Sequence, residues 1–228
     1  MAGDRLQASG NQERETKIKD SKDMRARVLQ ANAAGLDELP EGWFSPGDIA
    51  AYTKLYESTP VAGSTAELGV WQGRSICSVS QVIRRQRLCV HAVDTFQGTG
   101  GESDLVHDCQ GRLREVFESN LARFGIREYV RVHVGSTLSI AEAFEDASLD
   151  LVFIDSDHRY EQVAADIRAW LPKVKPGGLL SGHDYRRPWR HLWGHDRSGV
   201  KRAVDEILGK KGVIVSSGSS VWSYRLAA

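Results

Sequence analysis

Two short stretches of the sequence combine the residue types that bind metal ions and move protons. Asp155 and His158 follow one apolar run, and His183 with Asp184 follow the next apolar run along the chain. Two carboxylates brought together repel each other unless they share a proton or a cation, and oxygen ligands suit a hard cation such as Mg2+. Such an ion lowers the pKa of a hydroxyl group bound to it, and His158 is placed to take the proton as general base.

The same residues also have ordinary structural explanations. An aspartate before a helix commonly caps it, and Asp157 is expected to cap the helix that contains Tyr160. His183 is equally suited to hydrogen-bonding a loop. As a metal ligand, an imidazole favours Zn, Mn, Fe or Ni over Mg2+, so the identity of an ion at this place stays open.

A second group of residues surrounds a turn that contains two glycines. Glu67 precedes Gly69 and Gly73, and Ser75 stands near the start of the following helix. The glycines allow a sharp turn that brings backbone N–H groups close to a ligand. The pattern lacks G-x-G-x-x-G, and a carboxylate before the glycines suits a ligand with a positive amino-acid end better than a pyrophosphate. A tight turn without a ligand is the alternative.

Asp94 follows the next apolar run. At the tip of a second parallel strand it is placed to accept hydrogen bonds from both hydroxyls of a ribose. A helix cap or a turn residue is the alternative explanation.

For these residues to form one site, strands must carry them to the same edge of a sheet. Short apolar runs alternate with helical patterns, which predicts a mostly parallel α/β sheet covered on both faces. A final helix and two closely spaced runs then predict an antiparallel hairpin. The expected strands are 65–70, 88–93, 130–134, 149–154, 178–181, 213–217 and 221–225, and the expected helices are 75–84, 111–124, 138–144, 160–171 and 200–208.

The expected organisation is a flexible lead-in over 1–23, a helical cap over 24–60 and a main domain over 61–228. Within the cap, Ser45 or Asp48 is expected to start a helix. Trp170 and Trp222 are expected to pack in the core or against the sheet.

Composition limits the partners. The chain has 228 residues, and 30 basic residues balance 30 acidic ones, which gives no electrostatic reason to expect nucleic acid or an anionic membrane. The charged N-terminus and the absence of a long apolar run argue against a signal peptide or a membrane span. The three cysteines are odd in number and lack metal-like spacing, so a cytoplasmic protein with reduced thiols is expected.

Taken together, the motifs resemble a known family. The Glu67-x-Gly69-x-x-x-Gly73 turn, Asp94, Gly135-Ser136 and the terminal hairpin are similar to class I S-adenosylmethionine-dependent methyltransferases. The resemblance implies a Rossmann-like, doubly wound, mostly parallel seven-stranded sheet with a reversed strand in its C-terminal hairpin. It implies that the cofactor is bound by Glu67, Gly69, Trp71, Gly73, Ser75, Asp94, Thr95, Phe96, Ser136, Thr137 and Asp155.

The runs I-D-S-D-H-R-Y (154–160), K-P-G-G (175–178) and G-H-D-Y (182–185) resemble metal-dependent O-methyltransferases of natural-product sugars, a related cephalosporin-cluster enzyme and, more distantly, catechol O-methyltransferase. That resemblance spans roughly residues 60–226. It implies a metal held by Asp155, His183 and Asp184, with His158 as base. His183 departs from the pattern, because those sugar enzymes have an acid at this position. Mg2+ is the first expectation for the ion, and Mn2+ or another divalent ion is the alternative.

The expected reaction moves a methyl group from S-adenosylmethionine to a hydroxyl of a small molecule, a natural product or a sugar. The 186–197 loop, rich in Trp, Arg and His, is placed either to cover that substrate or to pack against the cap or another subunit, and 98–108 is expected to shape the entrance. A homodimer or higher homo-oligomer is compatible with the apolar cap. A metal-independent or nitrogen-directed methyltransferase and a nicotinamide-dependent oxidoreductase are the rival interpretations.

Overall fold

The computed structural model describes residues 39–98, 111–186 and 198–228. The predicted lead-in, residues 24–38 of the predicted cap, and most of the 98–108 and 186–197 segments lie outside these residues. The chain divides into two units, and the second, Pro40–Ala228, carries all the elements described below.

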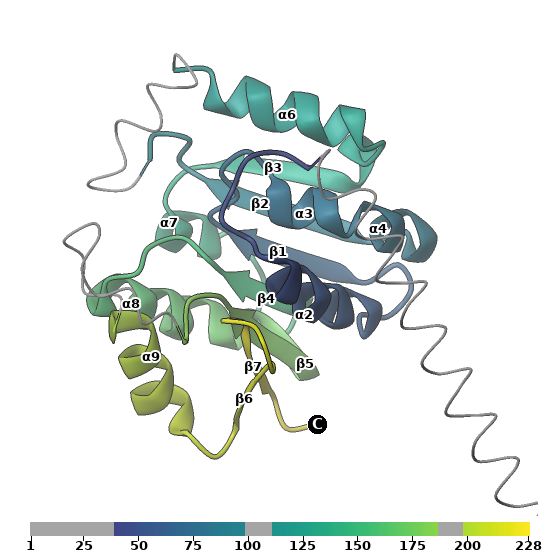
Figure 1. Cartoon of the computed structure of the whole chain (residues 1–228). Coiled ribbons are helices and arrows are strands. Elements are labelled where there is room, and N and C mark those ends of the chain that lie inside the picture. Colours follow the sequence, from purple (N-terminus) through teal and green to yellow (C-terminus); the bar gives the residue numbers. More distant parts are fainter. Residues whose placement is uncertain (1–38, 99–110, 187–197) are drawn as a thin grey trace, which may run out of the picture. The chain divides into compact units, whose positions relative to one another are not determined.

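A single sheet organises the described part of this unit. Its seven strands run in the order β3-β2-β1-β4-β5-β7-β6 (Figure 1). The first five strands are parallel, whereas β7 is antiparallel to both of its neighbours. The predicted sheet and its terminal hairpin are therefore confirmed. The strands are β1 (Ser64–Leu68), β2 (Cys89–Asp94), β3 (Val130–Val134), β4 (Leu149–Ile154), β5 (Val174–Gly182), β6 (Val213–Val215) and β7 (Trp222–Arg225).

Helices cover both faces of the sheet. In Figure 1, α2, α3 and α4 gather on one face, and α7, α8 and α9 on the other. The α-helices are α2 (Pro46–Glu57), α3 (Arg74–Ser78), α4 (Ser80–Gln86), α6 (Leu113–Arg123), α7 (Thr137–Ala141), α8 (Tyr160–Trp170) and α9 (Ser198–Val204). Short turns complete them: η1 (Arg127–Tyr129), η2 (Leu171–Lys173) and the π-helical η3 (Asp205–Gly209). Among the described residues, no helix is long and apolar enough to cross a membrane.

The start of α2 follows directly from its sequence. Ser45 is the N-cap, and its hydroxyl accepts a hydrogen bond from the Asp48 backbone N–H while the Asp48 carboxylate accepts from the Ser45 backbone N–H. Pro46 occupies the first helical position, where its missing N–H costs nothing. This reciprocal capping box confirms that the 45–48 segment starts a helix.

Some expected boundaries were wrong. The helix expected at 75–84 is broken at Val79, whose φ of −108° is not helical, so α3 and α4 are separate. Asp157 does not cap α8, because Arg159 is the N-cap; Asp157 instead accepts a hydrogen bond from the Arg159 backbone N–H at 2.8 Å.

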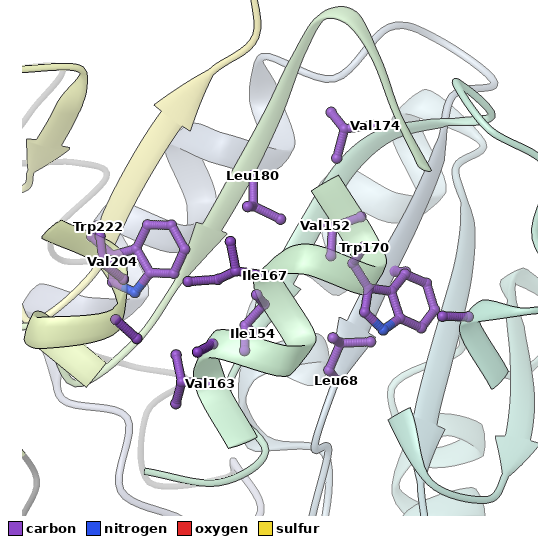
Figure 2. Packing of buried hydrophobic residues seen from close by; sticks show 14 of the residues in the cluster. Leu68, Val152, Ile154, Val163, Ile167, Trp170, Val174, Leu180, Val204 and Trp222 are labelled. Atoms are coloured by element: carbon purple, nitrogen blue, oxygen red, sulfur yellow. The ribbon is translucent and has the colours of Figure 1, made fainter. Parts of the chain in front are cut away.

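The core between the sheet and α8–α9 fixes the position of the carboxyl ends of the neighbouring strands. Figure 2 shows Ile167 and Trp170 of α8 packed over the sheet, with Trp222 of β7 on the far side of α8. Trp170 and Trp222 are almost fully buried, which confirms their expected place in the core. Burying a large apolar side chain contributes about 1.5–3 kcal/mol. The indole N–H of Trp170 also donates to the carbonyl of Thr137 at 3.1 Å, so α7 and α8 are held together.

Candidate active site

The carboxyl ends of the parallel strands form one continuous edge. Backbone hydrogen bonds extend the ladder past the strand ends: Gly69 N donates to Val93 O at 2.8 Å, and Asp155 N donates to Leu68 O at 2.8 Å. His183 N then donates to Ile154 O at 3.1 Å. The glycine turn and the two chemistry-bearing stretches are thus neighbours, as the parallel sheet predicts. We call this edge the carboxyl rim.

Three predicted site residues converge on this rim. One ligand atom each from Asp155, His158 and Asp184 lie within 4.8 Å of one another. His158 Nε2 is 2.5 Å from Asp184 Oδ2. Asp184 is 3% exposed and has a φ of +60°, a left-handed conformation that is uncommon for residues with side chains. Burial alone would raise the pKa of Asp184, but hydrogen bonds from His158 and His183 hold it well below its usual range.

His183 lies beneath these carboxylates rather than beside His158. It is buried, and its ring packs against Phe44 with centroids 4.9 Å apart. Its Nδ1 is 3.5 Å from Asp184 Oδ1 and 3.7 Å from Asp155 Oδ1, and its Nε2 is 3.2 Å from Asp48 Oδ2. Burial alone would lower the pKa of His183, but the surrounding carboxylates, Asp155 first, raise it to about 10. The rim therefore favours positive charge.

Asp48 was not recognised as a site residue from the sequence. The sequence indicated only that Asp48 could start a helix. Its carboxylate also accepts hydrogen bonds from Ser219 Oγ at 2.8 Å and Ser220 N at 2.9 Å. It therefore joins the start of α2 to the β6–β7 turn beneath the carboxyl rim. Burial alone would raise the pKa of Asp48, but the pairing with His183 and the hydrogen bonds from Ser45 and Ser220 hold it well below its usual range.

Glu67 lies inside the molecule. It is 1% exposed and accepts hydrogen bonds from the hydroxyls of Tyr52 and Ser75. Burial raises the pKa of Glu67 to about 8, although these two hydrogen bonds oppose the shift. The hydroxyls of Tyr52 and Tyr56 also lie 3.0 Å apart. Sequence reasoning missed the two tyrosines, whose four-residue spacing on α2 was the available signal. A contact between Glu67 and the methionine end of a cofactor stays a prediction.

Asp94 shapes the glycine turn. One carboxylate oxygen accepts from Val70 N at 2.8 Å and Trp71 N at 3.2 Å, and the other accepts from Phe96 N at 2.7 Å. A carboxylate has about four lone-pair positions, so these three bonds leave capacity for a further donor. Trp71 adopts a φ of +46° within this turn.

The turn requires glycine at Gly69 and Gly73 for two reasons: the backbone conformation is left-handed, and neighbouring atoms leave no room for a side chain. Gly69 and Gly73 have φ values of +81° and +86°. A Cβ at Gly69 would overlap the backbone of Asp155 and Ser156, and a Cβ at Gly73 would meet the ring of Phe117 at 2.9 Å. The turn therefore packs directly on the end of β4.

The remaining residues predicted to bind the cofactor differ in their exposure to solvent. Thr95 and Ser136 are exposed, and Ser136 caps α7. Thr137 is buried and its hydroxyl donates to Asp166 at 2.5 Å. Phe96 is 8% exposed, and its ring lies 5.6 Å from that of Phe117. Their cofactor contacts stay predictions, and for Phe96 an adenine contact would have to use the small exposed part of the ring.

Comparison with known proteins agrees with this arrangement. The model of a family described as a methyltransferase domain matches residues 66–185. A protein of Sinorhizobium fredii, described as uncharacterized, is 32% identical over 123 residues, which cover 52% of this chain and 12% of that protein. The chain thus corresponds to a small part of the length of this relative.

Solved structures share the fold at low sequence identity. The cofactor-bound protein Rv0187 from MTB superposes with a TM-score of 0.60 at 21% identity, covering 88% of this chain and 89% of that one. The O-methyltransferase TomG from Streptomyces achromogenes, involved in tomaymycin synthesis and solved with S-adenosylmethionine, gives a TM-score of 0.57 at 18% identity, covering 88% and 89%.

The family model covers more than half of the chain, and the sheet order and the glycine turn agree with it. The chain belongs to the methyltransferase domain family and has its Rossmann-like fold. The expected family is confirmed, and the family model that matches is not that of a nicotinamide-dependent oxidoreductase.

Proposed function

We propose that this protein transfers a methyl group from S-adenosylmethionine to a hydroxyl of a small molecule, assisted by a divalent metal ion. The observation that carries the proposal is the group of Asp155, His158 and Asp184 at the carboxyl rim. It places two carboxylates and an imidazole next to the glycine turn, where the family binds its cofactor. The O-methyltransferase TomG, a natural-product enzyme with the same fold, supports a small-molecule acceptor.

The donor set fits a metal ion. Its ligand atoms already lie within 4.8 Å of one another, and the carboxylates of Asp155 and Asp184 supply negative charge that a cation would balance. Oxygen ligands alone would suit Mg2+, but the nearby imidazoles favour Mn2+ and other first-row ions. When bound, such an ion would lower the pKa of an acceptor hydroxyl and hold it in place.

Each group of residues at the rim would then have a separate role in the reaction. The Gly69–Gly73 turn and Asp94 would hold the cofactor beside the carboxyl rim. Asp155 and Asp184 would hold the ion, which would supply Lewis acidity to the acceptor hydroxyl. His158 takes the hydroxyl proton at Nδ1, because its Nε2 faces and donates to Asp184, whose carboxylate stabilises the resulting imidazolium. Holding the two reactants in line supplies much of the rate, as is general for transfer between bound molecules.

The test is release of S-adenosylhomocysteine, followed by mass spectrometry. The protein is incubated with S-adenosylmethionine and a panel of catechols, hydroxylated sugars and amines, with EDTA and then with excess Mn2+ or Mg2+. Methylation of a hydroxyl acceptor that stops with EDTA and returns with metal supports the proposal. Methylation that survives exhaustive chelation would overturn the metal's role, and methylation confined to amines would overturn the oxygen acceptor.

A binding measurement separates the cofactor from the acceptor. Calorimetric titration with S-adenosylhomocysteine needs no acceptor and reports the cofactor site alone. The variant Asp94→Ala should weaken this binding, because it removes both the ribose acceptor and the carboxylate that holds Val70 N and Trp71 N. Asp146→Ala is the matched control, because Asp146 is exposed and pairs with Lys173.

A further inference from the structure

We propose that Asp166 is a positioning residue that couples cofactor binding to metal binding, because its carboxylate holds one hydroxyl from each side of the carboxyl rim. This inference rests on the proposed function. Asp166 lies on α8 and is 0% exposed, so it touches no substrate and acts through the two residues that it holds, Thr137 and Ser156.

The carboxylate of Asp166 joins the ends of two strands that are not neighbours. Its Oδ1 accepts a hydrogen bond from Thr137 Oγ1 at 2.5 Å, and its Oδ2 accepts from Ser156 Oγ at 2.7 Å. Thr137 begins α7, which follows β3, and Ser156 follows β4. Strands β2 and β1 lie between β3 and β4 in the sheet, so the side chain of Asp166 connects two segments that backbone pairing keeps apart.

The Thr137 side of this connection leads to the proposed cofactor site. Gly135 N donates to the carbonyl of Asp94 at 3.1 Å, and Asp94 is the carboxylate proposed to hold the cofactor. Ser136 then caps α7, and Thr137 is the first residue of that helix. A cofactor bound at Asp94 would therefore restrict the 135–137 segment, and the hydroxyl of Thr137 transmits this restriction to Asp166.

The Ser156 side leads to the proposed metal site. Ser156 directly follows Asp155, whose backbone N–H donates to Leu68 O at 2.8 Å. A Cβ at Gly69 would lie 2.6 Å from Ser156 Cα, so the glycine turn packs against this segment while Asp166 holds its hydroxyl. The position of Asp155 thus depends on both contacts.

A buried acid at this place costs stability that an apolar residue would not. Burial raises the pKa of Asp166, although the hydrogen bonds from Thr137, Ser156 and Gln162 oppose the shift. Replacing buried charged groups by well-packed apolar ones is often neutral or stabilising. The carboxylate offers instead two defined acceptors, and a buried polar network whose members are all satisfied is rigid. The acid therefore serves the geometry of the rim.

A rigid connection of this kind makes one binding event favour the other. A first ligand that orders part of a network lowers the entropy that a second ligand must remove. A cofactor that orders the 135–137 segment leaves less freedom to Asp166 and Ser156 before the metal binds. We expect saturating S-adenosylhomocysteine to tighten Mn2+ binding to the wild-type protein by about 5-fold, the lower end of the usual coupling between sites.

The test is calorimetric titration of the full chain with Mn2+, with and without S-adenosylhomocysteine. Asp166→Leu keeps the size of the side chain but removes both acceptors, so the tightening should disappear. Trp170 still donates to the Thr137 carbonyl in this variant, which keeps α7 on α8. Asp166→Asn is the conservative variant. Its amide can accept from one hydroxyl and donate to the other, so the tightening should return.

Ser156→Ala removes one side of the connection with a minimal change of volume. The tightening should be lost in this variant as well, whereas S-adenosylhomocysteine affinity measured without metal should stay at the wild-type value. Thr137 and Asp166 keep their own hydrogen bond in this variant, so its loss of coupling would come from the Ser156 contact.

Asp150→Asn is the matched control. Asp150 is also a part-buried carboxylate, and it accepts from Ser64 N at 2.8 Å and from Lys175 Nζ at 2.9 Å. It stands near the start of β4, at the opposite end of the strand from the carboxyl rim. This variant should lose stability and keep the tightening, which separates a general loss of folding from a specific effect at the rim.

The outcomes are distinct. Equal Mn2+ affinity with and without S-adenosylhomocysteine in the wild-type protein would overturn the inference and leave the proposed function standing. Tightening that persists in Ser156→Ala would also overturn it, whether or not Asp166→Leu folds. A fall of both affinities in Asp166→Leu with the tightening intact would show a merely structural role. A wild-type protein that binds no S-adenosylhomocysteine would instead overturn the proposed function, and one that binds it but no Mn2+ would overturn the metal's role together with this inference.

Discussion

His158 Nε2 lies 2.5 Å from Asp184 Oδ2, although the two residues come from the ends of different strands. The proposed base and a carboxylate of the proposed metal site are therefore one hydrogen-bonded pair. In the proposed mechanism, proton transfer and acceptor orientation are coupled through this contact, because a change in either side chain would alter the position of the other.

Replacement of His158 is the direct test of the base. His158→Gln keeps a polar side chain near Asp184 but cannot take a proton, so kcat should fall by about 10²- to 10⁴-fold, the usual contribution of a general base. The rate is measured with the acceptor that the release assay identifies. S-adenosylhomocysteine affinity should be unchanged, and a kcat close to wild type would assign the base elsewhere.

Glu67 should make stability depend on pH. In the unfolded chain it loses its proton near its ordinary pKa of 4.5, whereas in the folded chain burial raises this pKa to about 8. The stabilisation of the protonated form is therefore complete below pH 4.5 and is lost as pH rises toward 8, by about 1.4 kcal/mol per unit of pKa difference at most. Urea unfolding across this range should show a shallower pH slope in Glu67→Gln. Equal slopes in the two proteins would contradict the buried carboxyl.

The opposite slope is expected from His91. It lies on β2, its Nδ1 is 2.9 Å from His133 Nε2, and Phe144 covers its ring. Burial, helped by His133 and Arg131, lowers the pKa of His91 from 6.5 to about 4. Its contribution to stability is present above pH 6.5 and is lost as pH falls toward 4, because the unfolded chain binds the proton first. His91→Gln should flatten the acid side of the curve, and an unchanged curve would rule this histidine out.

A pair of glycine variants separates strain from overlap. Gly69 and Gly177 both have positive φ, +81° and +75°, which costs an L-residue about 1–2 kcal/mol. A Cβ at Gly69 would also overlap the Asp155 backbone, whereas at Gly177 nothing lies within 4 Å. Gly69→Ala should therefore lose more unfolding free energy than Gly177→Ala and should also lose S-adenosylhomocysteine affinity. Equal losses of stability in both, with cofactor affinity intact, would show that the turn does not pack on β4.

Much of the sheet was predictable from local sequence. The strands at 130–134 and 149–154 have the predicted bounds, because the first alternates valines with polar residues, the second is mostly apolar, and both end at a turn. The strand expected at 178–181 begins instead at Val174, since pairing of Leu149 with Val174 overrides the turn signal of Pro176 and Gly177. Tertiary pairing, rather than local propensity, decides that boundary.

The site was predictable only where it follows the strand ends. Asp155 and Asp184 could be placed on one rim from the parallel topology alone. Asp48 could not, because its partner Ser219 is 171 residues away and in a turn whose position depends on the whole sheet. The burial of Glu67 likewise depends on the packing of α2, which no spacing within the 67–75 motif reveals.

The place of β7 between β5 and β6 sets the order in which the molecule can be completed during synthesis. At a translation rate of about 5–20 residues per second, Ser219 is made roughly 9–34 s after Asp48, given the 171 residues between them. Through that interval the α2 carboxylate lacks its hairpin partners, and once β5 (Val174–Gly182) has been made its edge stays open until β7 follows. The parallel strands can pair while translation continues, but the carboxyl rim is finished only when the hairpin leaves the ribosome.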